Sequence, residues 1–446
     1  MPKRTFSIFF ICFLILLSVF TPICASAYEV TSFDITAESG MLVSLDTNEV
    51  LWERNSDKKV YPASITKIMT AVLMVESDKW DPTAKVTLSQ SAYDICLGTG
   101  LSVSLLNPGE EFTQLDLLYT VLLSSFGDCT YLAAEVFGGS IESFVGLMND
   151  KAQELGLLGT HYSNPVGLHE EGTYTTARDT YTLANYAKQY EIINEVTSKS
   201  RYKLVTTKGT TRTLSTTNFL LDSATRYYYP YATGFKTGYT DRAGRCLVST
   251  ASYNGYNYMC ILFKCPNNRD NRYEFLESRE LFRWAFKNFS FKEIANSTEP
   301  VCEIPLELSM QTDFVPLYFK EPFISVLPNE ADDSTIVVKK HFENETATAP
   351  IKKGQKLGYA EIIYAEKVIG KVDLIANEDI QSSGLLYFFK YVKEFFTSNF
   401  MKFVYLAIAL VIVGFILICI KLNIPKKKKK IKYIPYKENR NKDEKH

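Results

Sequence analysis

Alternating apolar and polar residues at both ends of the region 28–292 predict β-strands. The runs 40–45 (GMLVSL) and 49–53 (EVLWE) alternate around a short polar turn, which is typical of a β-hairpin. Residues 246–264 (CLVSTASYNGYNYMCILFK) contain two further strand-like runs around an Asn-Gly turn. That turn is a strong signal for a second hairpin.

Helical periodicity fills the sequence between and after these hairpins. A helical pattern follows Pro62 and runs to about Glu76, and residues 115–137 are another apolar stretch compatible with a helix. Residues 141–155 (IESFVGLMNDKAQEL) are amphipathic, and residues 276–288 (LESRELFRWAFKN) predict a closing helix. Hairpins at both ends with helices between them predict an α+β domain with a largely antiparallel sheet.

The pattern changes after this domain. Residues 297–383 show short alternating runs separated by turn residues, which predict a small all-β domain. Residues 384–402 are aromatic and weakly amphipathic, as expected of a segment along a membrane surface. Residues 403–420 are an uncharged run of 18 residues, about the minimum for a membrane-spanning helix. The basic tail 421–446 follows, and the positive-inside rule predicts that it is cytoplasmic.

The first 27 residues have the features of a secretory signal peptide. Lys3 and Arg4 precede a long apolar run, and residues 25–27 (ASA) form a small-residue cleavage site. An uncleaved first membrane helix is the alternative. We therefore expect a single-pass protein of the cell membrane, anchored by its C-terminal helix, with the preceding domains on the extracellular side.

The charges of the 446-residue chain are unevenly distributed. The formal net charge is −1, but residues 421–446 hold 11 basic and three acidic residues and the first 27 residues hold two basic ones. Residues 28–420 are left with 36 basic and 47 acidic residues, a net charge of −11. An acidic extracellular part argues against nucleic acid as a partner.

Six of the nine cysteines fall in the expected extracellular part: Cys96, Cys129, Cys246, Cys260, Cys265 and Cys302. Their sparse spacing does not resemble a disulfide scaffold, so buried free thiols are the favoured interpretation, although many pairings are possible. The sequence has no C-x-x-C motif and no histidine cluster, and we therefore expect no metal site and no cofactor.

A Ser-x-x-Lys pair lies at the start of the first predicted helix. Residues three apart on a helix are neighbours on one face, so Ser64 and Lys67 would present a hydroxyl and an amine side by side. The free amides and the dipole of a helix N-terminus stabilise negative charge, which would help an alkoxide-like serine. A lysine acts as a base only when burial or neighbouring positive charge lowers its pKa.

The Ser-x-x-Lys spacing alone is weak evidence for catalysis. A simple N-cap is the alternative role for Ser64, and residues 56–59 (SDKK) are a second match, expected in a surface loop. Two downstream segments change this balance. Ser125 heads the segment SFGDCTYLAAE, and residues 236–238 (KTG) precede the second hairpin. This order of motifs is that of penicillin-binding proteins and serine β-lactamases.

The chain as a whole resembles a serine D-alanyl-D-alanine carboxypeptidase, a low-molecular-mass penicillin-binding protein. The similarity runs from about residue 33 to 380 and includes YPASITKIMTA, GSIESFVGLMNDKAQELGL, GFKTGYTDRAGRCLVS and APIKKGQKLG. The resemblance implies a catalytic domain with an antiparallel sheet flanked by helices, then a β domain and a membrane helix. It implies removal of the terminal D-Ala from peptidoglycan stem pentapeptides, with β-lactams as covalent inhibitors.

The resemblance assigns three catalytic residues. Ser64 would attack the carbonyl between two terminal D-alanines and become an acyl-enzyme. Lys67 would take the proton of Ser64, and Ser125 would relay a proton to the leaving amine and position Lys67. Water would then release the acyl group.

It also assigns substrate-binding residues. Lys236 would keep the site positive and meet the substrate's carboxylate, to which Thr237 would donate a hydrogen bond. Gly238 would let the substrate backbone come close to the strand. The backbone amides of Ser64 and Tyr239 would form an oxyanion hole, which in general contributes about 3 kcal/mol of transition-state stabilisation.

One position departs from the family pattern. The second motif is usually Ser-x-Asn, and here it is Ser125-Phe126-Gly127, so no amide is present at its third position. Asp128 is the one candidate for part of that role, and Cys129 is expected in the core. Two alternative functions stay open at this point: a β-lactamase, and a catalytically weak penicillin-binding scaffold at the cell wall.

Overall fold

The computed structural model describes residues 34–423. The predicted signal peptide, residues 1–27, and all but the first three residues of the predicted tail lie outside the described residues. The described chain divides into two compact units. One contains the residues up to Thr298 with Phe319–His341 and Tyr359–Asp373, and the other contains Glu299–Tyr318, Phe342–Gly358 and the residues from Leu374 onward. The expected domain limits of 28–292 and 297–383 remain predictions.

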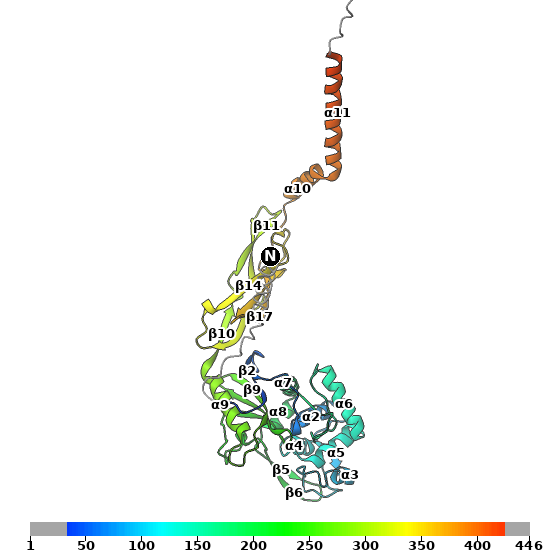
Figure 1. The fold of residues 1–446 in the computed structure, drawn as a ribbon, viewed down its shortest axis with the longest axis vertical. Helices are drawn as coiled ribbons and strands as arrows, with labels where there is room; N and C mark the ends of the chain where they lie inside the picture. Colours follow the sequence, from blue (N-terminus) through cyan, green and yellow to red (C-terminus); the bar gives the residue numbers. More distant parts are fainter. Residues whose placement is uncertain (1–33, 424–446) are drawn as a thin grey trace, which may run out of the picture. The chain divides into compact units, whose positions relative to one another are not determined.

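The first unit is built on a five-stranded sheet with the strand order β2-β1-β9-β8-β7, whose neighbours are all antiparallel (Figure 1). The strands are β1 (Ser39–Ser44), β2 (Val50–Arg54), β7 (Ala232–Thr240), β8 (Gly244–Tyr253) and β9 (Tyr256–Cys265). Both predicted hairpins are confirmed. Asn254 and Gly255 connect β8 and β9 with positive φ at both residues, the geometry of a two-residue hairpin turn.

Both faces of this sheet are buried, and alternate residues of each strand serve opposite faces. On one face, Met41, Val248 and Ile261 belong to the larger hydrophobic core, which the central helices share. On the other face, Leu42 and Leu262 pack with apolar side chains of the closing helix. A two-sided core explains why the two sequence ends of this domain lie together: β1 and β9 pair directly, with Gly40 opposite Leu262.

The helices of this unit follow the predicted pattern in most places. They are α2 (Lys67–Glu76), α3 (Gln90–Asp94), α4 (Gln114–Leu122), α5 (Gly127–Gly138), α6 (Ile141–Glu154), α7 (Ala177–Ala187), α8 (Glu191–Ser198) and α9 (Tyr273–Asn288). The unbroken helix-compatible stretch 115–137 is in fact two helices. The chain turns between α4 and α5 because Ser125 adopts a left-handed backbone, with φ of 61°.

Short elements complete the first unit. Two antiparallel pairs lie outside the main sheet, β3 (Lys85–Thr87) with β4 (Glu111–Thr113) and β5 (Arg201–Val205) with β6 (Thr211–Ser215). Three 3-10 turns are η1 (Ala63–Thr66), η2 (Phe219–Leu221) and η3 (Asp333–Thr335).

The chain after α9 is all-β until its last two helices, as predicted. The strands are β10 (Phe289–Ala295), β11 (Cys302–Glu307), β12 (Phe314–Phe319), β13 (Phe323–Pro328), β14 (Ile336–Phe342), β15 (Ala347–Thr348), β16 (Lys356–Tyr364) and β17 (Lys367–Ala376). Strands β12, β11 and β15 are hydrogen-bonded in that order, as are β14, β16 and β17. Strand β10 pairs with β13.

Two helices end the described chain, α10 (Gly384–Thr397) and α11 (Asn399–Asn423). Within residues 34–423, α11 is the one helix that is long and apolar enough to cross a membrane. It contains the whole predicted span, 403–420. Helix α10 carries several exposed phenylalanines, including Phe388, Phe389 and Phe395, as expected of a segment at a membrane surface.

Candidate active site

The Ser-x-x-Lys pair forms a tight turn that leads into α2. Residues Ala63–Thr66 make one turn of 3-10 helix, and Lys67 is the first residue of the α-helix. A 3-10 helix has three residues per turn, so side chains at positions i and i+3 eclipse one another. The turn therefore places Ser64 and Lys67 on the same side of the chain. Ser64 remains partly exposed, whereas Lys67 is 0% exposed.

The buried amine of Lys67 contacts the second motif. Its Nζ donates to the carbonyl oxygen of Ser125 at 2.5 Å and lies 3.2 Å from the Ser125 hydroxyl oxygen. Burial lowers the pKa of Lys67 to about 7, although the neighbouring Cys96 and Asp128 oppose this shift. A lysine with that pKa is partly neutral near pH 7, which is the form that can accept a proton.

The third motif lies on β7, one of the two edge strands of the main sheet. The Lys236 side chain is 0% exposed, and its Nζ donates to the Thr237 carbonyl at 2.8 Å. Burial, and then the charge of Lys67, hold the pKa of Lys236 well below its usual value. The Thr237 hydroxyl donates to the Thr217 hydroxyl at 2.6 Å.

A close approach of two backbones explains the glycine of this motif. A Cβ atom at position 238 would lie 3.0 Å from the Pro62 carbonyl oxygen and 3.1 Å from the Ser64 amide nitrogen. Strand β7 therefore packs directly against the turn that carries Ser64. A side chain at this position would push the two apart.

One pocket of about 350 Å³ brings the predicted motifs together. Five of the seven predicted site residues line it: Ser64, Ser125, Thr237, Gly238 and Tyr239. The other two, Lys67 and Lys236, are buried and are not part of its wall. Lys67 contacts Ser125, which lines the pocket, and Lys236 bonds the carbonyl of Thr237, which also lines it. The structure therefore unites the three motifs in one site.

The pocket also contains residues that the motif pattern did not identify. They include Leu101, Ser102, Thr217, Arg245 and Arg272. Arg245 lies opposite Tyr239 across the β7–β8 pair, with its guanidinium 4.2 Å from the ring centroid. The register of the β7–β8 pair places Arg245 opposite Tyr239, so pairing these two strands in the sequence could have identified Arg245 as a site residue. Arg272 precedes α9 and pairs with Glu274 at 2.6 Å, and no local pattern indicates that it reaches the site.

Asp128 is fully buried and does not line the pocket. Its carboxylate accepts hydrogen bonds from the Ser104 amide and hydroxyl and from the Cys129 amide. It also acts electrostatically on Lys67, whose pKa it raises, so the suggestion that it covers part of the amide's role stays a prediction. Cys129 lies in the hydrophobic core, as expected, and the cysteines 96, 246, 260 and 265 are likewise buried free thiols.

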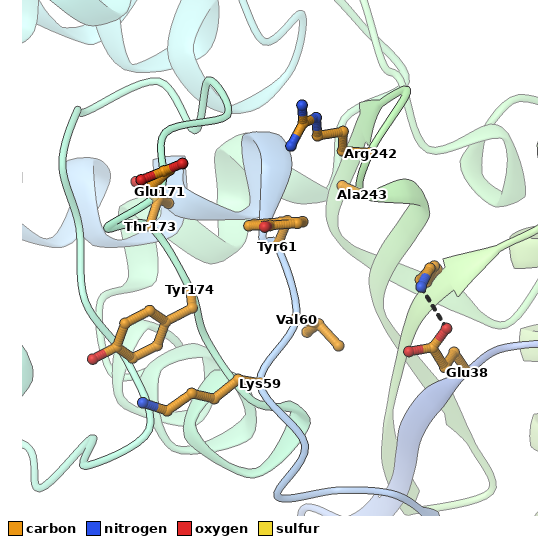
Figure 2. Close-up of a pocket in the computed structure, with 10 residues that line it drawn as sticks. Glu38, Lys59, Val60, Tyr61, Glu171, Thr173, Tyr174, Arg242 and Ala243 are labelled. Atoms are coloured by element: carbon orange, nitrogen blue, oxygen red, sulfur yellow. Dashed lines mark ion pairs between the residues drawn. The ribbon is translucent and has the colours of Figure 1, made fainter.

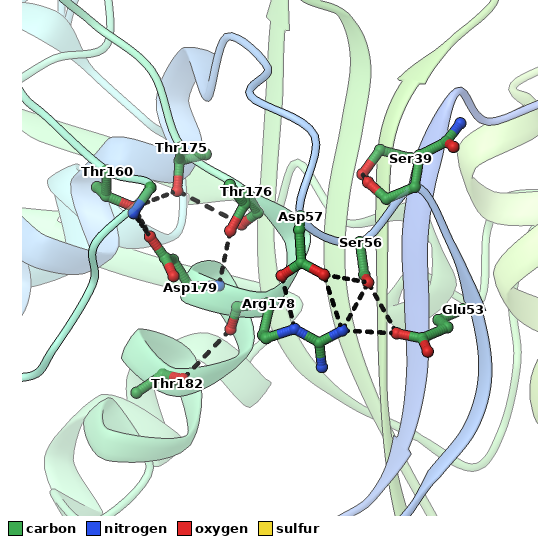
Figure 3. Close-up of polar contacts among 12 residues, drawn as sticks. Ser39, Glu53, Ser56, Asp57, Thr160, Thr175, Thr176, Arg178, Asp179 and Thr182 are labelled. Carbon is green, nitrogen blue, oxygen red and sulfur yellow. Dashed lines mark hydrogen bonds and ion pairs between the residues drawn. The ribbon is translucent and has the colours of Figure 1, made fainter. Parts of the chain in front are cut away.

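The second Ser-x-x-Lys match is part of a polar clamp (Figure 3). The expected surface loop is confirmed for residues 56–59, which form a turn with exposed Asp57, Lys58 and Lys59, although Ser56 itself is only 6% exposed. Its hydroxyl donates to Glu53 at 2.7 Å and accepts from Arg178 of α7 at 2.8 Å. Arg178 also bonds Asp57 at 2.7 Å. The clamp anchors the chain that leads from β2 to the serine turn.

A second pocket, of about 260 Å³, lies beside this connecting chain (Figure 2). Val60 and Tyr61 line it, only a few residues before Ser64. Charged residues are among those that line it. The Lys59 amine lies 3.8 Å from the Tyr174 ring centroid, and Glu38 forms an ion pair with Lys264 at 2.6 Å. It contains none of the predicted site residues.

The chain matches known proteins over both units. A family model described as D-alanyl-D-alanine carboxypeptidase (peptidase S11) matches residues 25–266, and one for the C-terminal domain of penicillin-binding protein 5 matches residues 307–382. The D-alanyl-D-alanine carboxypeptidase DacF of Bacillus subtilis is 32% identical over 357 residues, which are 79% of this chain and 88% of that protein.

Solved structures agree with the sequence matches. The structure of penicillin-binding protein 5 from Haemophilus influenzae is similar with a TM-score of 0.64 and 25% identity, covering 79% of this chain and 100% of that one. The Streptomyces K15 DD-transpeptidase is similar with a TM-score of 0.54 and 28% identity, covering 58% of this chain and all of that one.

Proposed function

Because the chain belongs to the peptidase S11 family of D-alanyl-D-alanine carboxypeptidases, and is thus a serine peptidase, we propose that Ser64 is its nucleophile and Lys67 its base. The observation that carries this assignment is the contact of the buried Lys67 amine with Ser125, beside a pocket that Ser64 and Ser125 both line. Among residues 34–423, the two other Ser-x-x-Lys matches end in exposed lysines, Lys59 and Lys203.

The proposed reaction has two steps. Neutral Lys67 accepts the proton of Ser64 while the serine oxygen attacks the carbonyl between the two terminal D-alanines. The C–N bond then breaks, the proton passes through Ser125 to the leaving amine, and D-Ala departs from an acyl-enzyme. Water attacks the ester in the second step, with its proton returned to Ser64 through the same lysine.

Positive charge would hold the substrate's terminal carboxylate. Arg245 and Arg272 line the pocket, and the Thr237 hydroxyl is within it. Lys236 is too deeply buried to form part of the pocket wall, so we propose that it acts by holding β7 through its bond to the Thr237 carbonyl rather than by a direct contact with the substrate. The amides of Ser64 and Tyr239 are the proposed oxyanion hole.

The direct test is mass spectrometry of the intact protein after exposure to benzylpenicillin. We expect one adduct, on Ser64, that persists for much longer than its formation takes. Rapid turnover of benzylpenicillin would favour the β-lactamase alternative, which the comparisons do not support over a carboxypeptidase. An absence of any adduct, together with no release of D-Ala from a pentapeptide, would favour a catalytically weak scaffold.

We also propose where the enzyme works. Helix α11 would anchor the chain in the cell membrane, with α10 along its outer surface and the catalytic unit facing peptidoglycan stem peptides. Protease added to intact protoplasts should remove the catalytic unit and leave an epitope on the C-terminal tail intact. Loss of the tail epitope under these conditions would contradict the proposed orientation.

A further inference from the structure

Position 127 leaves no room for a side chain. A Cβ atom there would lie 2.8 Å from Leu101 Cδ1, 3.1 Å from Leu101 Cβ and 3.3 Å from Cys96 Sγ. Carbon atoms in favourable contact are about 3.5–4.0 Å apart, so the Leu101 side chain would have to move to admit a Cβ at this position. Gly127 is therefore not a position with an empty space beside it, because the segment 96–102 fills that space.

This segment is attached to the second motif at Ser102 and Ser104, directly after Leu101. The Gly127 amide donates to the Ser102 carbonyl at 2.7 Å. Two residues later, the Asp128 carboxylate holds the Ser104 amide at 3.0 Å and its hydroxyl at 2.6 Å. Because the backbone is held at these points, Leu101 Cβ is fixed beside position 127, whereas Cδ1 is the end of a flexible side chain and turns away if a larger residue stands there.

The surface that results is apolar. Leu101 lines the active-site pocket together with Ser102 and Ser125. Cys96 lies behind it, is 4% exposed, and has its pKa raised by burial to about 11, so its thiol is neutral at physiological pH. A buried neutral thiol packs as a small hydrophobic group. The pocket wall beside Ser125 is thus formed by a leucine supported by a thiol.

We propose that Leu101, supported by Cys96, is a specificity-determining residue that occupies the place of the amide usual at the third position of the second motif. The substrate then meets an apolar side chain at this point and gains no hydrogen bond from it. The site favours acyl donors with an apolar group next to the reactive carbonyl. This inference rests on the proposed function, since it requires Ser64 to be the acylated residue.

Substrate choice gives the first test, on the detergent-solubilised full chain. We expect the second-order rate of acylation by benzylpenicillin, with its phenyl side chain, to exceed that by 6-aminopenicillanic acid, with a bare amine, by at least tenfold. Leu101→Ala should reduce this ratio at least threefold, raise KM for a pentapeptide, and leave kcat within twofold. An unchanged ratio and an unchanged KM would overturn the proposal.

Variants at position 127 give the second test. Gly127→Ala should slow acylation at least tenfold. The double variant Gly127→Ala/Leu101→Ala should be acylated at least threefold faster than Gly127→Ala alone. Gly146→Ala is the matched control, because nothing lies within 4 Å of a Cβ at that helical glycine. Acylation of Gly127→Ala within twofold of wild type, or no gain in the double variant, would overturn the proposal. If circular dichroism shows that Gly127→Ala does not fold, the first test decides the proposal, through the ratio of the two acylation rates in Leu101→Ala.

Different results would contradict the proposed function and the inference about Leu101. If Ser64→Ala still forms a penicillin adduct, the proposed function is wrong, and the test of Leu101 no longer applies. If wild-type protein is acylated on Ser64 but Leu101→Ala changes neither the ratio nor KM, only the inference about the pocket wall is wrong.

Discussion

Two of the three Ser-x-x-Lys segments of this chain, those that begin at Ser56 and Ser64, start eight residues apart and place their side chains in different environments. Ser56 is bonded to Glu53 and Arg178, while Lys59 lies exposed with its amine over the Tyr174 ring. Ser64 is partly exposed on a 3-10 turn, while Lys67 is buried against Ser125. Spacing aligns two side chains in both cases. Burial of the lysine, which only the segment at Ser64 has, lowers the pKa of Lys67 to about 7, as its proposed role as a base requires.

The largest difference between the segments should appear when each serine is replaced. Ser64→Ala removes the proposed nucleophile, so penicillin labelling and D-Ala release should fall by about 10³-fold or more. Ser56→Ala should retain activity within a few fold, because the residue contacts no pocket wall. Intact-mass labelling and a D-Ala release assay measure both. Equal loss in the two variants would show that the comparison is wrong.

The pH dependence of acylation should sharpen the role of Lys67. Its pKa of about 7 predicts that the acylation rate rises with pH through about 7 and falls about tenfold per pH unit below it. The pKa of this lysine is lowered on folding, so the unfolded chain binds the extra proton between about pH 7 and its ordinary value. The free energy of unfolding should therefore rise with pH across that window.

Stopped-flow acylation by a chromogenic cephalosporin, from pH 5 to pH 9, measures the rate profile. Comparison of urea unfolding of wild type with Lys67→Met over pH 7–10 isolates the stability effect of this one lysine. A rate that does not vary between pH 5 and pH 8 would contradict the assignment of Lys67 as base.

The clamp at the first segment should affect stability more than catalysis. Arg178→Ala removes the donor to Ser56 and Asp57 and leaves the largely buried Ser56 with one partner fewer. We expect a loss of about 1–2 kcal/mol in the free energy of unfolding, because Arg178 is partly exposed and its ion pairs are screened. Urea unfolding measures this. Thr182→Ala, on the same helix but exposed, is the control, and equal destabilisation by both would argue against a clamp.

The smallest effect should come from the lysine of the first segment. Lys59→Ala removes an exposed amine over the Tyr174 ring, a contact that contributes about 0.5–1 kcal/mol. Acylation should stay within twofold of wild type, in contrast with Lys67→Ala. A tenfold loss in Lys59→Ala would show that the second pocket, which Lys59 lines, communicates with the active site.

Much of the site could be predicted from the sequence because its motifs are local. Ser64 and Lys67 are three residues apart, residues 236–238 are contiguous, and the Asn-Gly turn after β8 identifies the hairpin that follows them. Each of these signals depends on neighbours in the chain. The helix break at Ser125 could not be predicted in this way, because the apolar pattern of 115–137 continues through it and only the backbone of Ser125 reveals it.

The sequence by itself determined the order of elements, the two hairpins and the set of reactive side chains, since periodicity and turn chemistry act over a few residues. Tertiary structure decided which lysine is buried with a lowered pKa and what fills the space beside Gly127. Lys67 owes its lowered pKa to burial by distant segments, and Leu101 reaches position 127 from a different part of the chain. Burial and steric contact between remote residues have no signature in local spacing, so only the folded chain reveals them.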